Sequence, residues 1–195
     1  MFTPLPTLPP PQLQLGEGLL LADVDLPALL DAEDPAALLA DPSRLSAHVL
    51  GTAAEGCEFR CIPRTLHTEQ RGQRTPTRAT LTPIAWEVSL SGSLTAVTPE
   101  NAAFLLCAPP PGPVRRAAIT PGSCCVTPDN LCWIGATSAG MMLIELHAPL
   151  STGGLHFRSG ATDTGRTPFV FTARQRFPGD HPPCTLYFLK EGDAA

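Results

Sequence analysis

Two runs near the C-terminal end alternate between apolar and other residues, which is the pattern of strands with one buried face. The first run is Thr167–Phe177 and the second is Cys184–Leu189, with a turn-rich segment of proline, glycine and aspartate between them. One face of the first run contains Phe169, Phe171, Ala173, Gln175 and Phe177. We therefore expect both runs to be strands at the end of a β-structure.

The longest alternating run is Ile84–Ala96. Its apolar side consists of Ile84, Trp86, Val88, Leu90, Leu94 and Ala96, and its polar side consists of Glu87, Ser89, Ser91, Ser93 and Thr95. This predicts a strand with one face in the core and the other facing water or a polar interface. Gly92 interrupts the apolar side, which indicates either a bulge or a close approach of another chain segment.

Shorter patterns complete the element list. Strands are expected at 17–24, 56–62 and 153–158, and a hairpin is expected from 131–136 and 141–148. Thr98 and Pro99 are typical of a helix start and predict one helix over about 99–107, before a proline-rich stretch. Prolines at 35 and 42 limit any helix within 26–48 to one or two turns. Together these patterns predict a mainly β fold, an antiparallel sandwich or barrel with one flanking α-helix.

The distribution of proline predicts the domain organisation. The chain has 195 residues and 23 prolines, which require long connections because proline interrupts helices and central strands. Residues 1–16 have no periodicity and are expected to form an extended arm, and residues 17–195 to form a single domain. Within that domain, residues 63–79 are expected to be a long polar loop that carries Arg64, Arg71, Arg74 and Arg78.

Charge and cysteine content narrow the function classes. The formal net charge of −5 argues against a general binder of nucleic acid or of anionic membranes. The sequence has no run of roughly 20 apolar residues and its start lacks the features of a secretion signal, so we expect the chain to stay in the cytoplasm where it is made. The seven cysteines are then expected to be reduced and to act as small buried hydrophobes. Cys57 and Cys61 share a strand face with Phe59.

The search for chemistry finds no motif. The five histidines lack metal-ligand spacing, C-x-x-C is absent, and neither a nucleophile elbow nor a phosphate-binding loop is present. Glu58, Glu87 and Glu145 are interpreted as scattered surface carboxylates. A metal site assembled from histidines distant in sequence stays open. We expect no catalytic residue, no cofactor and no metal, and a structural or binding role rather than an enzyme.

Four motifs, in this order, carry a resemblance to a known family. They are Leu50–Phe59 (LGTAAEGCEF), the alternating strand Trp86–Leu94 with the helix start Thr98–Ala102, the aromatic strand Leu131–Gly135, and Gly153–Leu155 with Phe169–Ala173 and the Pro182-Pro183 approach to the last strand. Over roughly Leu50 to Leu189, the chain resembles the major tail tube proteins of long-tailed bacteriophages.

The resemblance implies a virion protein that works by assembling. Such subunits form rings, here expected to be hexameric, which stack into the tail tube that conducts DNA during ejection. The implied partners are other copies of the chain, the tape measure, the tail terminator and the baseplate or tail-tip proteins. DNA would pass without specific binding, no membrane would be involved, and assembly would occur in the host cytoplasm.

Two site hypotheses follow from the resemblance. Glu87, Ser89 and Ser91 would face the lumen, and the arginines of the 63–79 loop would contact neighbouring rings. The alternative interpretation is a monomeric β-sandwich that acts as a binding or adhesion module.

Overall fold

The computed structural model describes residues 15–30, 48–53, 56–67, 81–95, 98–109, 119, 121, 127–137, 140–156, 166–173 and 182–189. They form the elements β1 (Leu15–Ala22), α1 (Leu26–Leu30), β2 (His48–Ala53), β3 (Glu58–His67), β4 (Leu81–Leu94), α3 (Pro99–Leu105), β5 (Asn130–Thr137), β6 (Gly140–His147), β7 (Pro149–Ser151), β8 (Thr167–Ala173) and β9 (Cys184–Leu189). In this part of the chain no helix has the length and apolar character needed to cross a membrane.

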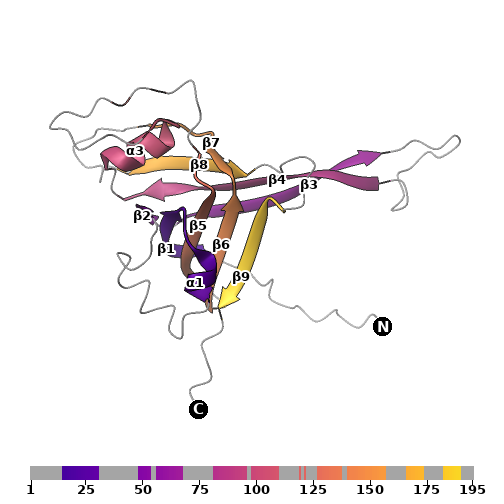
Figure 1. Ribbon diagram of the computed structural model, residues 1–195. Coiled ribbons are helices and arrows are strands. Elements are labelled where there is room, and N and C mark those ends of the chain that lie inside the picture. The colour runs from indigo at the N-terminus through magenta and orange to yellow at the C-terminus, as the bar shows by residue number, and fades with distance from the viewer. Residues whose placement is uncertain are drawn as a thin grey trace, which may run out of the picture.

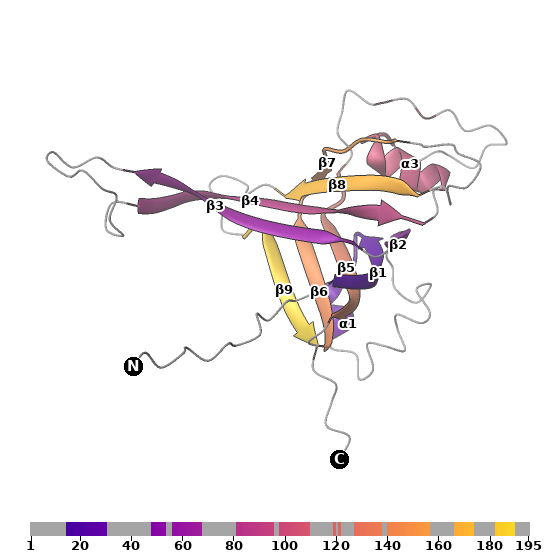
Figure 2. The same cartoon turned by 180° about the vertical axis from the view of Figure 1, so that it is seen from behind.

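The strands form one antiparallel sheet, which confirms the predicted fold class. Its order is β7-β8-β4-β2-β1-β5-β6-β9, and β3 pairs with β4. β2 meets β4 through the single pair Ala53 and Leu94, and otherwise pairs with β1. In Figures 1 and 2, β3, β4 and β8 run across the view while β5, β6 and β9 run down it. The sheet is thus folded into two layers that cross over a shared core.

The core lies between these two layers. Its largest fully buried members come from both of them and include Leu20, Leu90, Trp133, Ile144, Phe169 and Phe171. Burying a side chain of this size contributes roughly 1.5–3 kcal/mol relative to leaving it exposed. The alternation in β8 therefore predicted correctly that Phe169, Phe171 and Ala173 face inward. A second, smaller cluster lies on the opposite face of β1, β5 and β6, where α1 contributes Leu26 and Leu29.

Trp133 occupies a slot that two paired glycines create. Gly18 of β1 lies opposite Gly135 of β5. A Cβ on Gly18 would lie 2.2 Å from Trp133 Nε1, and a Cβ on Gly135 would lie 2.6 Å from Trp133 Cζ2. Both distances are far inside van der Waals contact, so the indole packs directly on the backbones of two strands. Any side chain at either position would push the indole out of the core.

The helix α3 begins where the sequence predicted. Thr98 is the N-cap, its Oγ1 accepts a hydrogen bond from the Asn101 backbone N at 3.2 Å, and Pro99 occupies the first turn. The Asn101 side chain is buried and its Nδ2 donates to the Leu50 carbonyl on β2. At the other end, Ser151 Oγ donates to the Leu105 carbonyl at 2.9 Å. These bonds fix the helix against β2 and β7.

Two predicted boundaries were wrong, the first because the β3–β4 pairing extends further than hydrophobicity indicates. Residues 63–67 were assigned to the polar loop, yet they belong to β3, which pairs with β4 from Glu58–Ser91 to His67–Leu81. Pairing in a two-stranded ribbon depends on backbone hydrogen bonds and does not require an apolar pattern. The rest of that loop, residues 68–79, lies outside the described residues. The expected arm loses Leu15 and Gly16 to β1, and residues 1–14 lie outside the described residues.

Three further expectations were tested. The strand expected at 153–158 is not found in residues 153–156, where the chain is irregular after β7 and Gly154 has φ +63°; residues 157 and 158 lie outside the described residues. Any helix within 26–48 was limited by the prolines to one or two turns, and α1, a single turn at the start of this range, agrees with that limit; residues 31–47 lie outside the described residues. Gly92 marks a close approach: a Cβ there would lie 2.6 Å from Cys57 Sγ, and pairing with β8 continues without a bulge.

Candidate functional site

The polar side of β4 lies on the outer face of its layer, as predicted. Glu87, Ser89 and Ser91 alternate along β4, and Ser89 and Ser91 are paired with Thr172 and Val170 of β8. Glu87 is exposed and the two serines are partly buried. The structure therefore brings the three predicted lumen residues together on one outward face of the sheet.

The charges described on this face balance one another. Arg64 Nε and Nη2 both donate to Glu87 Oε2, at 3.1 and 2.8 Å, and Arg60 Nε lies 3.4 Å from Glu58 Oε1. All four side chains are exposed, so each pair contributes only about 0–1 kcal/mol and is weakened by salt. Arg64 was predicted to lie in a contact loop, but it is a strand residue that neutralises Glu87. Arg71, Arg74 and Arg78 lie outside the described residues.

The other face of the β3–β4 ribbon is apolar and continues beyond the core. Val88 and Leu90 are fully buried, whereas Ile84 and Trp86 on the same face are 52% and 44% exposed. Figures 1 and 2 show the reason, because β3 and β4 extend well past the strands of the facing layer. The prediction that Ile84 and Trp86 belong to the core was therefore wrong. Alternation identifies the face of a strand but does not show how far the opposite layer reaches.

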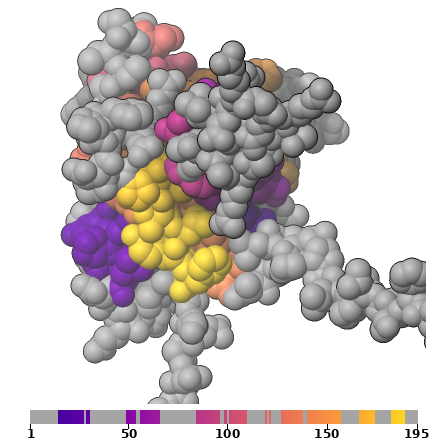
Figure 3. All heavy atoms as spheres, turned by 90° about the vertical axis from the view of Figure 1, so that its right-hand side faces the viewer, coloured from indigo at the N-terminus to yellow at the C-terminus, as the bar shows by residue number. Residues whose placement is uncertain are grey.

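β9 adds a second uncovered apolar strip. Leu186 and Phe188 point to the same side as Cys184, yet they are 40% and 60% exposed. The side chains of β9 lie on the surface in Figure 3 (yellow). Cys184 itself is partly buried and packs against the main core, so the exposed strip on β9 begins at the edge of the core. We call the four exposed residues Ile84, Trp86, Leu186 and Phe188 the apolar corner.

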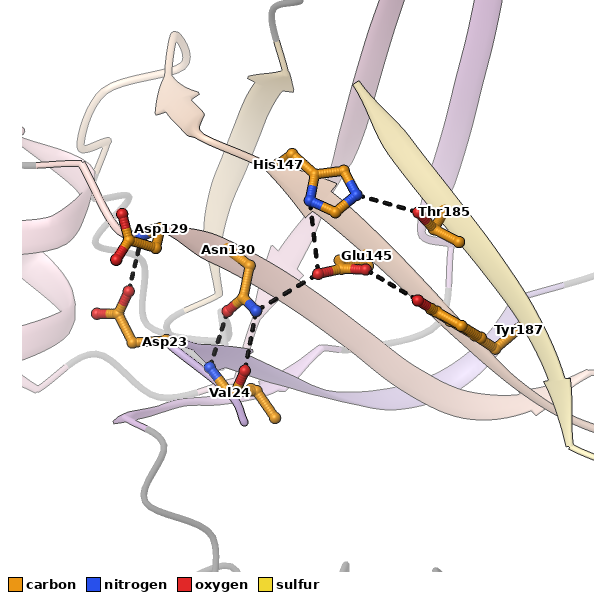
Figure 4. A network of polar contacts seen from close by, with 8 residues as sticks. All are labelled: Asp23, Val24, Asp129, Asn130, Glu145, His147, Thr185 and Tyr187. Atoms are coloured by element: carbon orange, nitrogen blue, oxygen red, sulfur yellow. Dashed lines mark hydrogen bonds and ion pairs between the residues drawn. The ribbon is translucent and has the colours of Figure 1, made fainter. Parts of the chain in front are cut away.

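A polar network lies on the opposite face of β5, β6 and β9, beside α1 (Figure 4). Its centre is the Glu145 carboxylate, which is only 5% exposed. Tyr187 Oη donates to Oε2 at 3.3 Å, and Asn130 Nδ2 lies 3.5 Å from Oε1. His147 Nδ1 also lies 3.5 Å from Oε1, and its Nε2 lies 3.0 Å from Thr185 Oγ1. Several polar groups therefore compensate for the burial of this carboxylate.

Asn130 extends the network to the turn that follows β1. Its side-chain Oδ1 accepts from the Val24 N at 2.8 Å and its Nδ2 donates to the Val24 carbonyl at 2.9 Å. Asp23 has φ +54°, a conformation that aspartate tolerates better than most residues, and its carboxylate accepts from the Asp129 N at 2.7 Å. The network thus attaches the β1–α1 turn to the start of β5.

The surroundings of Glu145 favour the protonated forms of the Tyr187 phenol and the Cys132 thiol. Burial raises the pKa of Tyr187, and the charge of Glu145 raises it further. Burial likewise raises the pKa of the Cys132 thiol, again with a contribution from Glu145. Among the residues that the structure describes, no group of three or more potential metal ligands occurs. Because Glu145 is engaged with surrounding donors, the network serves to fasten three strands and a turn together.

Glu145 is the residue that sequence reasoning misjudged. It was interpreted, with Glu58 and Glu87, as one of three scattered surface carboxylates. The signal was present: Met142, Leu143, Ile144 and Leu146 surround it in a nearly continuous apolar run, which is typical of a strand buried on both faces. A charge inside such a run is expected to be buried and paired.

Comparison of the chain with models of known protein families and with curated proteins finds no match.

Proposed function

We propose that this chain is a self-assembling structural subunit, the major tube protein of a long phage tail. The proposal rests on the ordered sequence motifs described above, on the mainly β fold that they led us to expect, and on the apolar corner. Copies would close into rings, and stacked rings would form the conduit for DNA.

The apolar corner is the observation that carries the proposal. Two of its four large side chains lie on the β3–β4 ribbon and two lie on β9, the last strand in the order of the sheet. Contiguous exposed apolar patches on soluble proteins mark sites of interaction, because covering them with a partner removes apolar surface from water. A subunit completed by its neighbours explains why this surface is not covered by the chain itself.

Ring closure needs two different surfaces that match, since the contacts of a cyclic assembly run head to tail. The corner supplies one of them.

The polar face with Glu87, Ser89 and Ser91 points to the other side of the ribbon and would be available to line the channel. Arg60 and Arg64 on this face pair with glutamates, so these two residues offer DNA little free positive charge, as a conduit requires. The tape measure, terminator and baseplate proteins would meet the tube at its lumen and ends.

Light scattering coupled to size-exclusion chromatography tests the proposal. The purified chain is applied over a wide range of concentrations, with a reducing agent present throughout. We expect the mass to rise from that of single chains to that of rings or longer assemblies as concentration increases. A mass of one chain at every concentration would contradict the proposal and support the monomeric binding module.

A further inference from the structure

The last strand of the sheet carries apolar side chains that the described chain leaves uncovered. Leu186 and Phe188 of β9 pair with Ile144 and Met142, which are buried in the main core, yet they are 40% and 60% exposed. Among the described residues β9 pairs only with β6, so no further strand of that part of the chain lies beyond it. We call Leu186 and Phe188 the β9 strip. An apolar segment that covered the β9 strip would remove apolar surface from water.

The segment 1–14 joins the sheet at the same end and on the same face. Leu15, the first residue of β1, packs against the main core and pairs with Thr137, the last residue of β5. The end of β9 lies at this end of the sheet too, because Leu189 pairs with Met141 near the start of β6. The strand order is β1, β5, β6 and β9. Three strand spacings of about 4.8 Å therefore separate Leu15 from the end of β9, which is a distance of roughly 14 Å.

The segment 1–14 is long enough to cross this distance and continue along β9. In a polyproline conformation each residue spans about 3.1 Å, so about five residues cross roughly 14 Å. Residues 1–9 are then available for contact with the β9 strip. Because the segment is tethered close to the strip, its effective concentration there is on the order of millimolar. A weak contact is therefore sufficient to keep the strip covered.

The composition of the segment matches the strip. Residues 1–14 contain no charged side chain, whereas every other segment of more than five residues outside the described part of the chain contains at least one. β9 has no charged residue either. A proline-rich segment needs no ladder of backbone hydrogen bonds and docks on apolar and aromatic surfaces through its side chains. The large side chains between the prolines of this segment are Phe2, Leu5 and Leu8.

We propose that the segment 1–14 docks on the β9 strip of its own chain and covers Leu186 and Phe188 until another copy displaces it. The docking is a contact within one chain, and only its effect on assembly rests on the proposed function. Ile84 and Trp86 stay exposed, so the apolar corner as a whole is still completed only by another copy. The segment raises the concentration at which copies assemble, because it must leave the strip first.

Photo-cross-linking of the full chain tests the docking. Phe188→benzoylphenylalanine is irradiated at low concentration, and linked peptides are identified by mass spectrometry. A mixture of isotope-labelled and unlabelled chains separates links within one chain from links between chains. We expect links from position 188 to residues 1–14 of the same chain. The matched control is Ile62→benzoylphenylalanine, which places the probe at a 48% exposed position on the opposite side of the ribbon and should give no link to this segment.

A second variant changes the segment and leaves the sheet as it is. Leu5→Ser combined with Leu8→Ser should lower the yield of the link from position 188 at least about tenfold, because both leucines lose their apolar contact with the strip. The same double change, in a chain that keeps Phe188, should lower the concentration needed for assembly, measured by light scattering.

The docking would be overturned if position 188 gave no link to residues 1–14, or linked to these residues only in another chain. A link within one chain together with an unchanged assembly concentration in the double variant would overturn the effect on assembly and confirm the docking. Chains that link in this way but stay single at every concentration would contradict the proposed function instead.

Discussion

Replacing Trp86 with serine is the perturbation that addresses the apolar corner most sharply. The residue is 44% exposed, so roughly 100 Å² of a side chain of up to about 250 Å² remains in contact with water. At about 25 cal/mol per Å², covering that area in a subunit contact contributes about 2.5 kcal/mol. Since interfaces recover only part of this energy, we expect Trp86→Ser to raise the concentration needed for assembly roughly 10- to 100-fold.

The assay is the concentration dependence of mass by light scattering, with a matched control on the same ribbon. Ile62 is 48% exposed and is paired with Glu87 on the polar face. Ile62→Ser therefore removes exposed apolar surface from the opposite side and should leave the assembly concentration nearly unchanged. Both side chains are about half buried, so both variants should lose some stability, and urea denaturation should show that both remain folded under the conditions of the assay. Equal assembly by Trp86→Ser and the unmodified chain would refute the role of the corner.

Three predictions concern the fold. Gly18→Ala should lower the free energy of unfolding by about 1–3 kcal/mol in urea denaturation, because its methyl group would overlap the Trp133 indole. An unchanged urea midpoint would contradict the close packing of Trp133 on the backbone of β1. Tyr187 is the only tyrosine, so absorbance titration should show its phenol ionising above the ordinary value of about 10, and Glu145→Gln should lower that pKa. Because the folded state raises the pKa of Tyr187, the contribution of its phenol to stability is complete below about pH 10 and is lost as pH rises through the folded pKa. A Tyr187 phenol that titrates at the ordinary value would argue against the network. Thr98→Ala should destabilise the chain by about 1 kcal/mol by removing the helix cap, while Thr98→Ser should retain most of the stability, and equal losses would exclude capping as the cause.

The sequence predicted those features that depend on local pattern. Alternation placed Phe169 and Phe171 in the core, and Thr98 with Pro99 located the start of α3. The hairpin of β5 and β6 followed from two apolar runs around a short turn that ends in Gly140. In each case the deciding interactions lie within a few residues of one another.

The errors concern features that depend on how distant segments meet. Trp86 has the same periodic signature as Leu90, and only the length of the facing layer makes one exposed and the other buried. Glu145 appeared to be a surface residue until Tyr187 and Asn130 supplied its donors from other strands.

The central claim is that copies of this chain complete one another, and electron microscopy of the purified full-length protein at high concentration tests it most directly. The account predicts rings, or tubes of stacked rings, with a central channel. Uniform single particles of one chain, in the absence of any ring, would contradict it.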